Sequence, residues 1–442
     1  MSSTLIESAK TLAGGELTPA NILLEDDKIK SVSKTKPITK ADTTIHANGL
    51  IALPGLIDAH VHLRDLELSY KETFETGTQA AVAGGYTTVL DMPNTRPPTI
   101  NAARLKEKIA KAQGRLHSNV GFQGALTTDP AEGRSMKEEG AIAFKLYLNK
   151  SLQTFDSNNL SNLATAFRAA KENNVLVTVH AEDANAILRI QQKSLNEGKT
   201  SVQDFLQAHS PQTESISVRT VVGLSGQVGV RVHFCHITLP ESVRLIRTLS
   251  NASCEATGHH LLLNRQAFRR FGTLAICVPP IRTETTRGGL WKEFVAGGVD
   301  ILASDHAPHT IQEKSQENAW QAASGVPGLE TSLPLMLTQV SNGKLSLRRL
   351  VEAASEFPAR IFHLTRKGAL REGFDADIVL VDPKAKVTIN PTKFLTKAKY
   401  TPFKGMKCVG TAAYTFVNGT LAVERGRILG PPAGRVIKSG SE

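Results

Sequence analysis

The feature that most restricts the fold of this 442-residue chain is a regular alternation of short apolar segments with helix-like segments. Eight apolar segments follow one another between residues 56 and 306: LIDAHVHL, TTVLDMP, VGFQGAL, AIAFKLYL, VLVTVHA, VRVHFCH, SCEAT and DILASDH. Helix-like stretches such as NAARLKEKIAKAQ and LSNLATAFRAAKENN lie between them. Strands that alternate with helices in this number predict an α/β fold, the (β/α)8 or TIM barrel, over residues 53–366.

Both ends of the chain predict β structure instead. Near the N-terminus, NILLEDDKIKSV contains two apolar runs across an Asp-Asp turn, which favours a hairpin. Near the C-terminus, DADIVLVD reads as a strand and TFVNGTLAVE places Asn-Gly between alternating residues, a strong hairpin signal. Neither end has enough strands for a stable sheet, so we expect residues 1–52 and 367–442 to form one small β-sandwich domain together.

Composition excludes several classes of protein. No apolar run approaches the length of a membrane span, and the N-terminus lacks the basic start and long apolar segment of a secretory signal. Four scattered cysteines do not make a disulfide framework, which favours a reducing, cytoplasmic location. The net charge of +11 comes without basic blocks interleaved with aromatic residues, so we expect small anionic substrates and no nucleic acid.

Potential metal ligands follow the carboxyl ends of the predicted strands, where barrel active sites lie. A lone histidine at a strand end is more often a hydrogen-bonded core residue, and a lone aspartate could cap a helix. Imidazoles and a carboxylate gathered at one end of a barrel instead suit a divalent ion such as zinc. The residues concerned are His60, His62, His180, His236 and Asp305.

Lys145 stands in the middle of the apolar run AIAFKLYL. A lysine is almost never fully buried without a partner, so on its own it would be expected to extend its amine to the surface. Beside four histidines and an aspartate a second interpretation is open. A buried, neutral lysine amine can react with CO2 to give a carbamate, whose two oxygens could bridge two metal ions.

On these residues the chain resembles the amidohydrolase superfamily, and within it the dihydroorotases that use a carboxylated lysine. The resemblance runs from about residue 53 to 362 and rests on PGLIDAHVHLR, DMPNTRPP, KLYLN, HAED, CHIT, CEATGHH, SDHAPHT and SGVPGLET. It implies one zinc ion on His60, His62 and Asp305 and a second on His180 and His236, with Lys145 on both. It also implies a metal-bridging hydroxide, with Asp305 as the general acid/base.

The same resemblance predicts how a substrate would bind. Arg64 follows His62 on the same face of an extended chain and offers a planar fork to a carboxylate. Asn94 can donate to and accept from an imide edge, and His309 can reach the same carboxylate. A surface salt bridge with Asp65 or Glu67 is the alternative for Arg64.

These residues favour dihydroorotase, the reversible cyclisation of N-carbamoyl-L-aspartate to L-dihydroorotate in pyrimidine (UMP) biosynthesis. Dihydropyrimidinases, hydantoinases and allantoinases, other cyclic-amide hydrolases, share the metal site but typically lack this arginine and the SDHAPH run. A non-catalytic scaffold with the same barrel is the third reading. The family is often dimeric, and association with aspartate transcarbamoylase is left open.

The chain departs from the family pattern at three places. HLRDLE replaces HLREPG, Val278 stands where relatives have a substrate-contacting asparagine, and Ser151-Leu152 replaces a Thr-Phe pair on a lid. Cys235 and Glu255 lie beside the expected metal ligands, which leaves open a third zinc ion.

Overall fold

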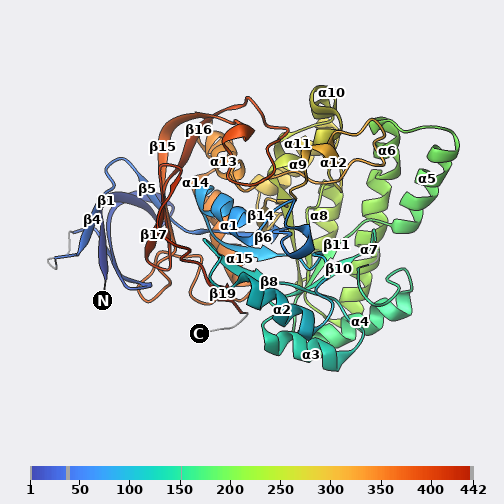
Figure 1. Cartoon of the computed structure of the whole chain (residues 1–442), viewed down its shortest axis with the longest axis horizontal. Coiled ribbons are helices and arrows are strands. Elements are labelled where there is room, and N and C mark those ends of the chain that lie inside the picture. Colours follow the sequence, from blue (N-terminus) through green and yellow to red (C-terminus); the bar gives the residue numbers. More distant parts are fainter. Residues whose placement is uncertain (1, 36–39, 151, 439–442) are drawn as a thin grey trace.

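The computed structural model describes residues 2–35, 40–150 and 152–438, and its centre is a closed barrel of parallel strands (Figure 1). Neighbouring barrel strands pair in parallel, and a bridge between Val61 and His306 joins the last strand to the first. The strands are β6 (Leu56–Val61), β7 (Tyr86–Asp91), β8 (Asn119–Phe122), β9 (Gly124–Ala125), β10 (Phe144–Tyr147), β11 (Val177–His180), β12 (Val232–Phe234), β13 (Ala252–Thr257) and β14 (Ile301–Ala303). Each of the eight expected strand segments overlaps one of these strands or, in VGFQGAL, the pair β8 and β9. The barrel prediction is therefore confirmed.

Helices connect these strands and cover the outside of the barrel. The two stretches expected to be helical form α2 and α4, and each begins at an asparagine whose side chain accepts a backbone N–H of the first turn. The helices are α1 (Phe74–Ala83), α2 (Ala102–Ala112), α3 (Pro130–Glu139), α4 (Leu160–Glu172), α5 (Ala184–Asn196), α6 (Val202–Ala208), α7 (Pro211–Val228), α8 (Pro240–Ile246), α9 (Gly258–Leu262), α10 (Gln266–Phe271), α11 (Glu284–Val295), α12 (Ile311–Lys314), α13 (Ser332–Ser341), α14 (Leu347–Val351) and α15 (Phe357–Ile361).

A buried ion pair ties α2 to the barrel. Lys108 on α2 places its Nζ 2.6 Å from Oδ2 of Asp91 at the end of β7, and both side chains are at most 1% exposed. The same Nζ donates to the Met92 carbonyl, while Asp91 accepts the backbone N–H of Leu63. This pair therefore fixes the backbone that follows β6.

The two ends of the chain meet in one sheet, which confirms that they form a shared β domain. The path runs β18-β17-β16-β15-β5-β1-β2-β3, with β4 paired to β1, and Figure 1 shows the blue and red strands side by side. N-terminal β5 and C-terminal β15 pair antiparallel where the two halves join. The strands are β1 (Ser3–Ala13), β2 (Glu16–Glu25), β3 (Lys28–Ser33), β4 (Thr43–His46), β5 (Ile51–Pro54), β15 (Ile378–Thr388), β16 (Lys407–Val417), β17 (Thr420–Glu424) and β18 (Arg427–Ile428).

Both expected hairpins are present in this domain. β2 and β3 pair antiparallel across the Asp26-Asp27 turn, and β16 and β17 pair across Asn418-Gly419. The latter two residues have φ values of 48° and 78°, the left-handed pair that a tight hairpin turn requires. A Cβ on Gly419 would lie 1.8 Å from the Asp26 carbonyl oxygen, so only glycine fits where the two hairpins touch.

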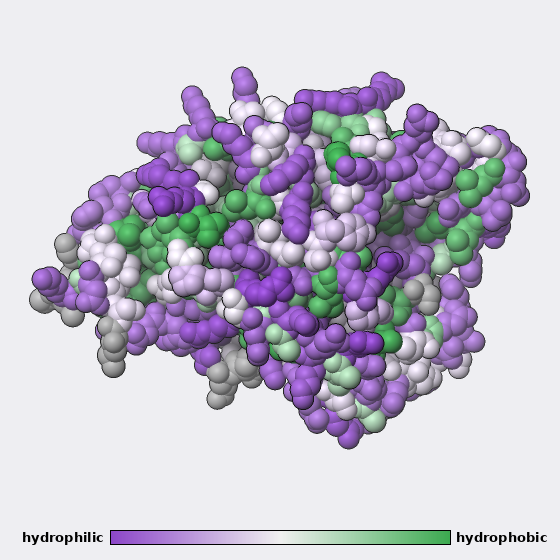
Figure 2. Space-filling view, in the orientation of Figure 1, coloured by the Kyte–Doolittle hydropathy of each residue, from purple (hydrophilic) through white to green (hydrophobic). Residues whose placement is uncertain are grey.

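The C-terminal tail returns to the barrel. Its short strand β19 (Val436–Ile437) pairs in parallel with β8 and not with the terminal sheet. The boundaries proposed for the three segments stay predictions. In the described residues no helix is long and apolar enough to cross a membrane. Hydrophilic side chains cover most of the face seen in Figure 2, with smaller hydrophobic areas between them.

Candidate active site

Three of the expected metal ligands meet at the carboxyl end of the barrel. His60 and His62 lie at and just beyond the end of β6, and Asp305 follows β14. Asp305 Oδ1 lies 3.3 Å from His60 Nε2 and 3.1 Å from His62 Nε2. One ligand atom from each of the three buried side chains lies within 4.8 Å of the others. These atoms surround a space of the size that a divalent ion needs.

The other two histidines form a second group beside the first. His180 ends β11 and His236 follows β12, and their Nδ1 and Nε2 atoms are 3.0 Å apart. The ring centroid of His236 lies 5.1 Å from that of His60. All five expected imidazole and carboxylate side chains are thus brought together, as two adjoining groups.

Lys145 on β10 is fully buried, and its Nζ points to the same region. The ammonium lies 2.8 Å from the Cys235 sulfur and 5.1 Å from the Tyr147 ring centroid. Burial lowers the pKa of His180 and His236, and the positive charge of Lys145 adds to that effect. Burial and the same charge oppose Glu255 and Asp305, which raise the pKa of His60 to about 10, so Lys145 stands beside both groups. Its one side-chain hydrogen bond in the described part of the chain goes to Cys235 and not to a carboxylate. The strand therefore does not carry this lysine to the surface.

The outward-facing ring nitrogens of three histidines are held by oxygen atoms. His60 Nδ1 lies 2.5 Å from Glu255, His62 Nδ1 2.7 Å from the Asn94 side-chain oxygen, and His180 Nε2 2.8 Å from Glu182. Each of these oxygens can accept the proton of the outward ring nitrogen, an arrangement that frees the nitrogen facing the group to bind a cation. Metal-binding histidines in proteins are oriented in this way, so the donor set fits two divalent ions.

Electrostatics keep the carboxylates of the site ionised. Burial raises the pKa of Asp305, but the neighbouring His60 and His62 outweigh it and hold this pKa well below its ordinary value. Burial likewise raises the pKa of Glu255, and His60 and His233 reverse the shift. An anionic, buried Asp305 can both bind a cation and accept a proton.

Three residues of the site have left-handed backbone conformations that non-glycine residues rarely adopt. The φ values are 58° for Arg64, 37° for His236 and 46° for Asp305. Such strain persists only where the surroundings enforce it, and it concentrates at functional sites. In this site the left-handed conformation directs the side chains of Arg64, His236 and Asp305 toward the carboxyl end of the barrel.

A cavity of about 310 Å³ opens above these groups, and all three expected substrate-binding residues line it. Arg64 Nη2 lies 3.2 Å from His309 Nε2, and Arg64 Nε donates to the Pro308 carbonyl. Among the described residues Arg64 has no carboxylate partner, and Asp65 pairs with Arg115 instead. The surface salt bridge considered for Arg64 is therefore not formed.

The cavity also contains residues that the sequence analysis did not select. Tyr147, Asn149, Lys150 and His209 line it, and the Tyr147 hydroxyl and Asn149 Oδ1 are buried without a hydrogen-bond partner in the described residues. Tyr147 ends the Lys145 strand and Asn149 and Lys150 follow it, and that position was the available signal; His209, after α6, had none. Glu182 was also missed, although it follows His180 by two residues in an extended segment.

The structure tests only some of the places where the sequence departs from the family pattern. Val278 lines the cavity. Ser151 lies outside the described residues, so the lid expected at Ser151-Leu152 is not tested. For the third metal, His60, Cys235 and Glu255 place one ligand atom each within 4.8 Å of one another. Both Glu255 oxygens already contact histidines, His60 and His233, so the third ion stays a prediction.

Comparison with known proteins agrees with this geometry. The family model described as "Amidohydrolase family" matches residues 51–422. The dihydroorotase of Methanothermobacter thermautotrophicus is 37% identical over 412 residues, 92% of each chain. The L-hydantoinase of Paenarthrobacter aurescens is 31% identical and covers 97% of this chain and 96% of its own. A solved structure, the L-hydantoinase (dihydropyrimidinase) of Arthrobacter aurescens, superposes with a TM-score of 0.95 at 30% identity over 99% of this chain and all of its own.

Proposed function

Since the chain belongs to the amidohydrolase family and is a hydrolase of cyclic amides, we propose that its reaction is that of a dihydroorotase. It would interconvert N-carbamoyl-L-aspartate and L-dihydroorotate, a step of pyrimidine biosynthesis. The observation that carries this proposal is Arg64, a buried guanidinium on the cavity wall without a carboxylate partner in the described residues. Dihydroorotate brings such a carboxylate on its ring, whereas dihydrouracil and hydantoin do not.

We propose two zinc ions at the two histidine groups. His60, His62 and Asp305 would hold one, His180 and His236 the other, and a carboxylated Lys145 would contact both. Zinc bound there would polarise the ring carbonyl and ease the ionisation of water near neutral pH. Conversion of Lys145 to a carbamate also removes a buried cation from beside three histidines, which supports its modification.

The chain's own groups would then guide substrate and proton. Arg64 would hold the ring carboxylate through two parallel N–H bonds, with His309 beside it. In the hydrolytic direction Asp305 would take a proton from the water that attacks the ring carbonyl. It would pass that proton to the ring nitrogen as the C–N bond breaks. Cyclisation would use the same path in reverse.

A hydantoinase or dihydropyrimidinase is the second candidate, because the L-hydantoinase relative covers nearly the whole chain. The deciding experiment compares turnover of L-dihydroorotate, dihydrouracil, hydantoin and allantoin by zinc-loaded protein. We expect turnover of dihydroorotate, with kcat/KM reduced about tenfold to a hundredfold in Arg64→Ala and unchanged in the surface control Arg168→Ala. Turnover of a ring without a carboxylate, insensitive to Arg64→Ala, would identify the second candidate.

The bridging role of Lys145 can be tested separately. Lys145→Ala should lose most activity and one or both zinc ions, as measured by elemental analysis. Full activity with two ions retained would exclude the bridging carbamate. Sedimentation of the purified protein, alone and with aspartate transcarbamoylase, would test the homodimer and the association that the family suggests.

A further inference from the structure

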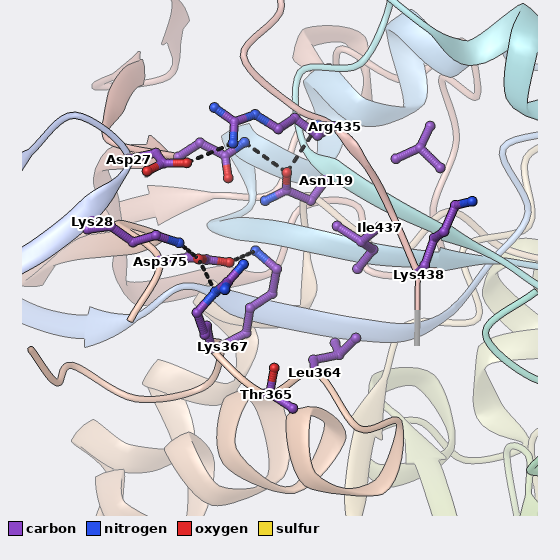
Figure 3. Close-up of a pocket in the computed structure, with 13 residues that line it drawn as sticks. Asp27, Lys28, Asn119, Leu364, Thr365, Lys367, Asp375, Arg435, Ile437 and Lys438 are labelled. Atoms are coloured by element: carbon purple, nitrogen blue, oxygen red, sulfur yellow. Dashed lines mark hydrogen bonds and ion pairs between the residues drawn. The ribbon is translucent and has the colours of Figure 1, made fainter. Parts of the chain in front are cut away.

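A second cavity, of about 130 Å³, is drawn in Figure 3 and lies at the end of the barrel where strands begin, opposite the candidate active site. Asn119, which lines it, is the first residue of β8, whereas the active-site groups follow the last residues of their strands. The turn between β2 and β3, the segment after α15 and the C-terminal tail close it. Three separate parts of the chain therefore meet around this space.

Positive charge exceeds negative charge at this cavity. A single carboxylate, Asp375, faces three cations: Lys28, Lys367 Nζ at 3.0 Å and Arg366 Nε at 3.4 Å. Lys367 also contacts Asp377, at 2.5 Å, so the charges of three cations are balanced by only two carboxylates. Arg435 and Asp27 form a neutral pair at the rim.

Several donors around the cavity are not used by the described residues. Arg366 Nε is buried and makes no hydrogen bond despite its approach to Asp375. The Lys28 side chain is 35% exposed, and its one hydrogen bond in the described residues goes to Asp375, which leaves two N–H donors for solvent or a ligand. A buried donor without a partner is costly, and the cavity is large enough for an acceptor that would satisfy it.

We propose that this cavity binds a phosphate group, either free phosphate or the phosphate of a phosphomonoester. A tetrahedral dianion offers several acceptor oxygens to guanidinium and ammonium donors and balances the excess positive charge. Leu364 and Ile437 give the cavity an apolar side that would suit the carbon skeleton of an ester. Such a ligand would join the N-terminal hairpin, the barrel and the C-terminal tail, and so stabilise the folded chain.

Calorimetric titration with inorganic phosphate and with ribose 5-phosphate tests the proposal and separates the two sources. We expect binding to the wild-type protein that weakens at least tenfold in Arg366→Gln and in Lys28→Gln. It should be unchanged in Arg168→Gln, a surface control, and in Arg64→Ala, which removes the anion-binding side chain of the active-site cavity. Tighter binding of ribose 5-phosphate than of phosphate would identify the ester as the ligand.

Two further measurements locate the site. Phosphate should raise the thermal midpoint of the wild-type protein and leave that of Arg366→Gln unchanged, with circular dichroism confirming that the variant is folded. Crystals grown with tungstate should show an anomalous peak between Arg366 and Lys28. No binding, or binding that Arg64→Ala abolishes and Arg366→Gln preserves, would overturn the proposal. The proposal does not depend on which cyclic amide the enzyme hydrolyses.

Discussion

Replacement of Lys108 by methionine should destabilise the protein strongly, although Lys108 is neither a candidate metal ligand nor a candidate substrate-binding residue. The substitution keeps the shape of the side chain and removes the cation that faces Asp91 at 2.6 Å. Asp91 is then left as a carboxylate with no exposed surface, held by the Leu63 N–H. Removing one partner of a buried ion pair in this way costs about 3–5 kcal/mol of unfolding free energy.

The loss should depend on pH and on Asp91. Burial already raises the pKa of Asp91 and Lys108 opposes that rise, so Lys108→Met raises this pKa further. An acid whose pKa is higher in the folded than in the unfolded chain loses stability as pH rises through that interval. The variant should therefore be closest to wild type at low pH. Adding Asp91→Asn removes the unpaired charge and should restore at least about 2 kcal/mol.

Urea unfolding at pH 5 and pH 8, followed by circular dichroism, measures these differences. Lys111→Met on the exposed side of the same helix is the matched control and should stay within about 0.5 kcal/mol of wild type. If Lys108→Met/Asp91→Asn is no more stable than Lys108→Met, or if the loss does not vary with pH, the reasoning from an uncompensated charge is wrong.

Three further predictions follow from other contacts. Glu255→Gln should lower zinc affinity about 10–100-fold in a chelator competition, because it weakens the hold on two histidine rings; unchanged affinity would contradict this positioning role. Burial raises the pKa of Glu330 to about 7 from 4.5, so this group costs stability as pH rises through that range, and Glu330→Gln should flatten the pH dependence of the urea midpoint there. Gly419→Ala should lower the urea midpoint more than Gly426→Ala, since both have φ near 80° but only Gly419 abuts the Asp26 carbonyl. Equal losses would show that backbone strain alone matters.

The features that could be predicted from the sequence are those that depend on neighbouring residues alone, such as a strand, the side to which a ring points, or a tight turn. The apolar run around Lys145 predicts a buried strand without reference to any other segment, and the alternation His60-Val61-His62 sets both rings on one side. The Asn418-Gly419 hairpin is equally local, because two left-handed residues determine its turn. Each of these features needs only the residues beside it.

Contacts between residues that lie far apart in the sequence could not be predicted in this way. Glu255 contacts His60 across 195 positions of sequence, and nothing near either residue specifies that pairing. The two-residue strand β19 is too short to show any period, so its return to the barrel could not be seen. The excess of cations around Asp375 likewise arises only when residues near both termini meet.

The pairing of β5 with β15 has a consequence for how the chain is made. β5 ends at Pro54, and its partner begins at Ile378, more than 300 residues later. At synthesis rates of about 5–20 residues per second, roughly 16–65 s pass between the synthesis of β5 and that of β15. The barrel is translated in this interval and can begin to fold, while the apolar edge of β5 stays open to other chains. Chaperones that shield nascent strands should therefore matter more for the first fifty residues of this enzyme than for its catalytic core.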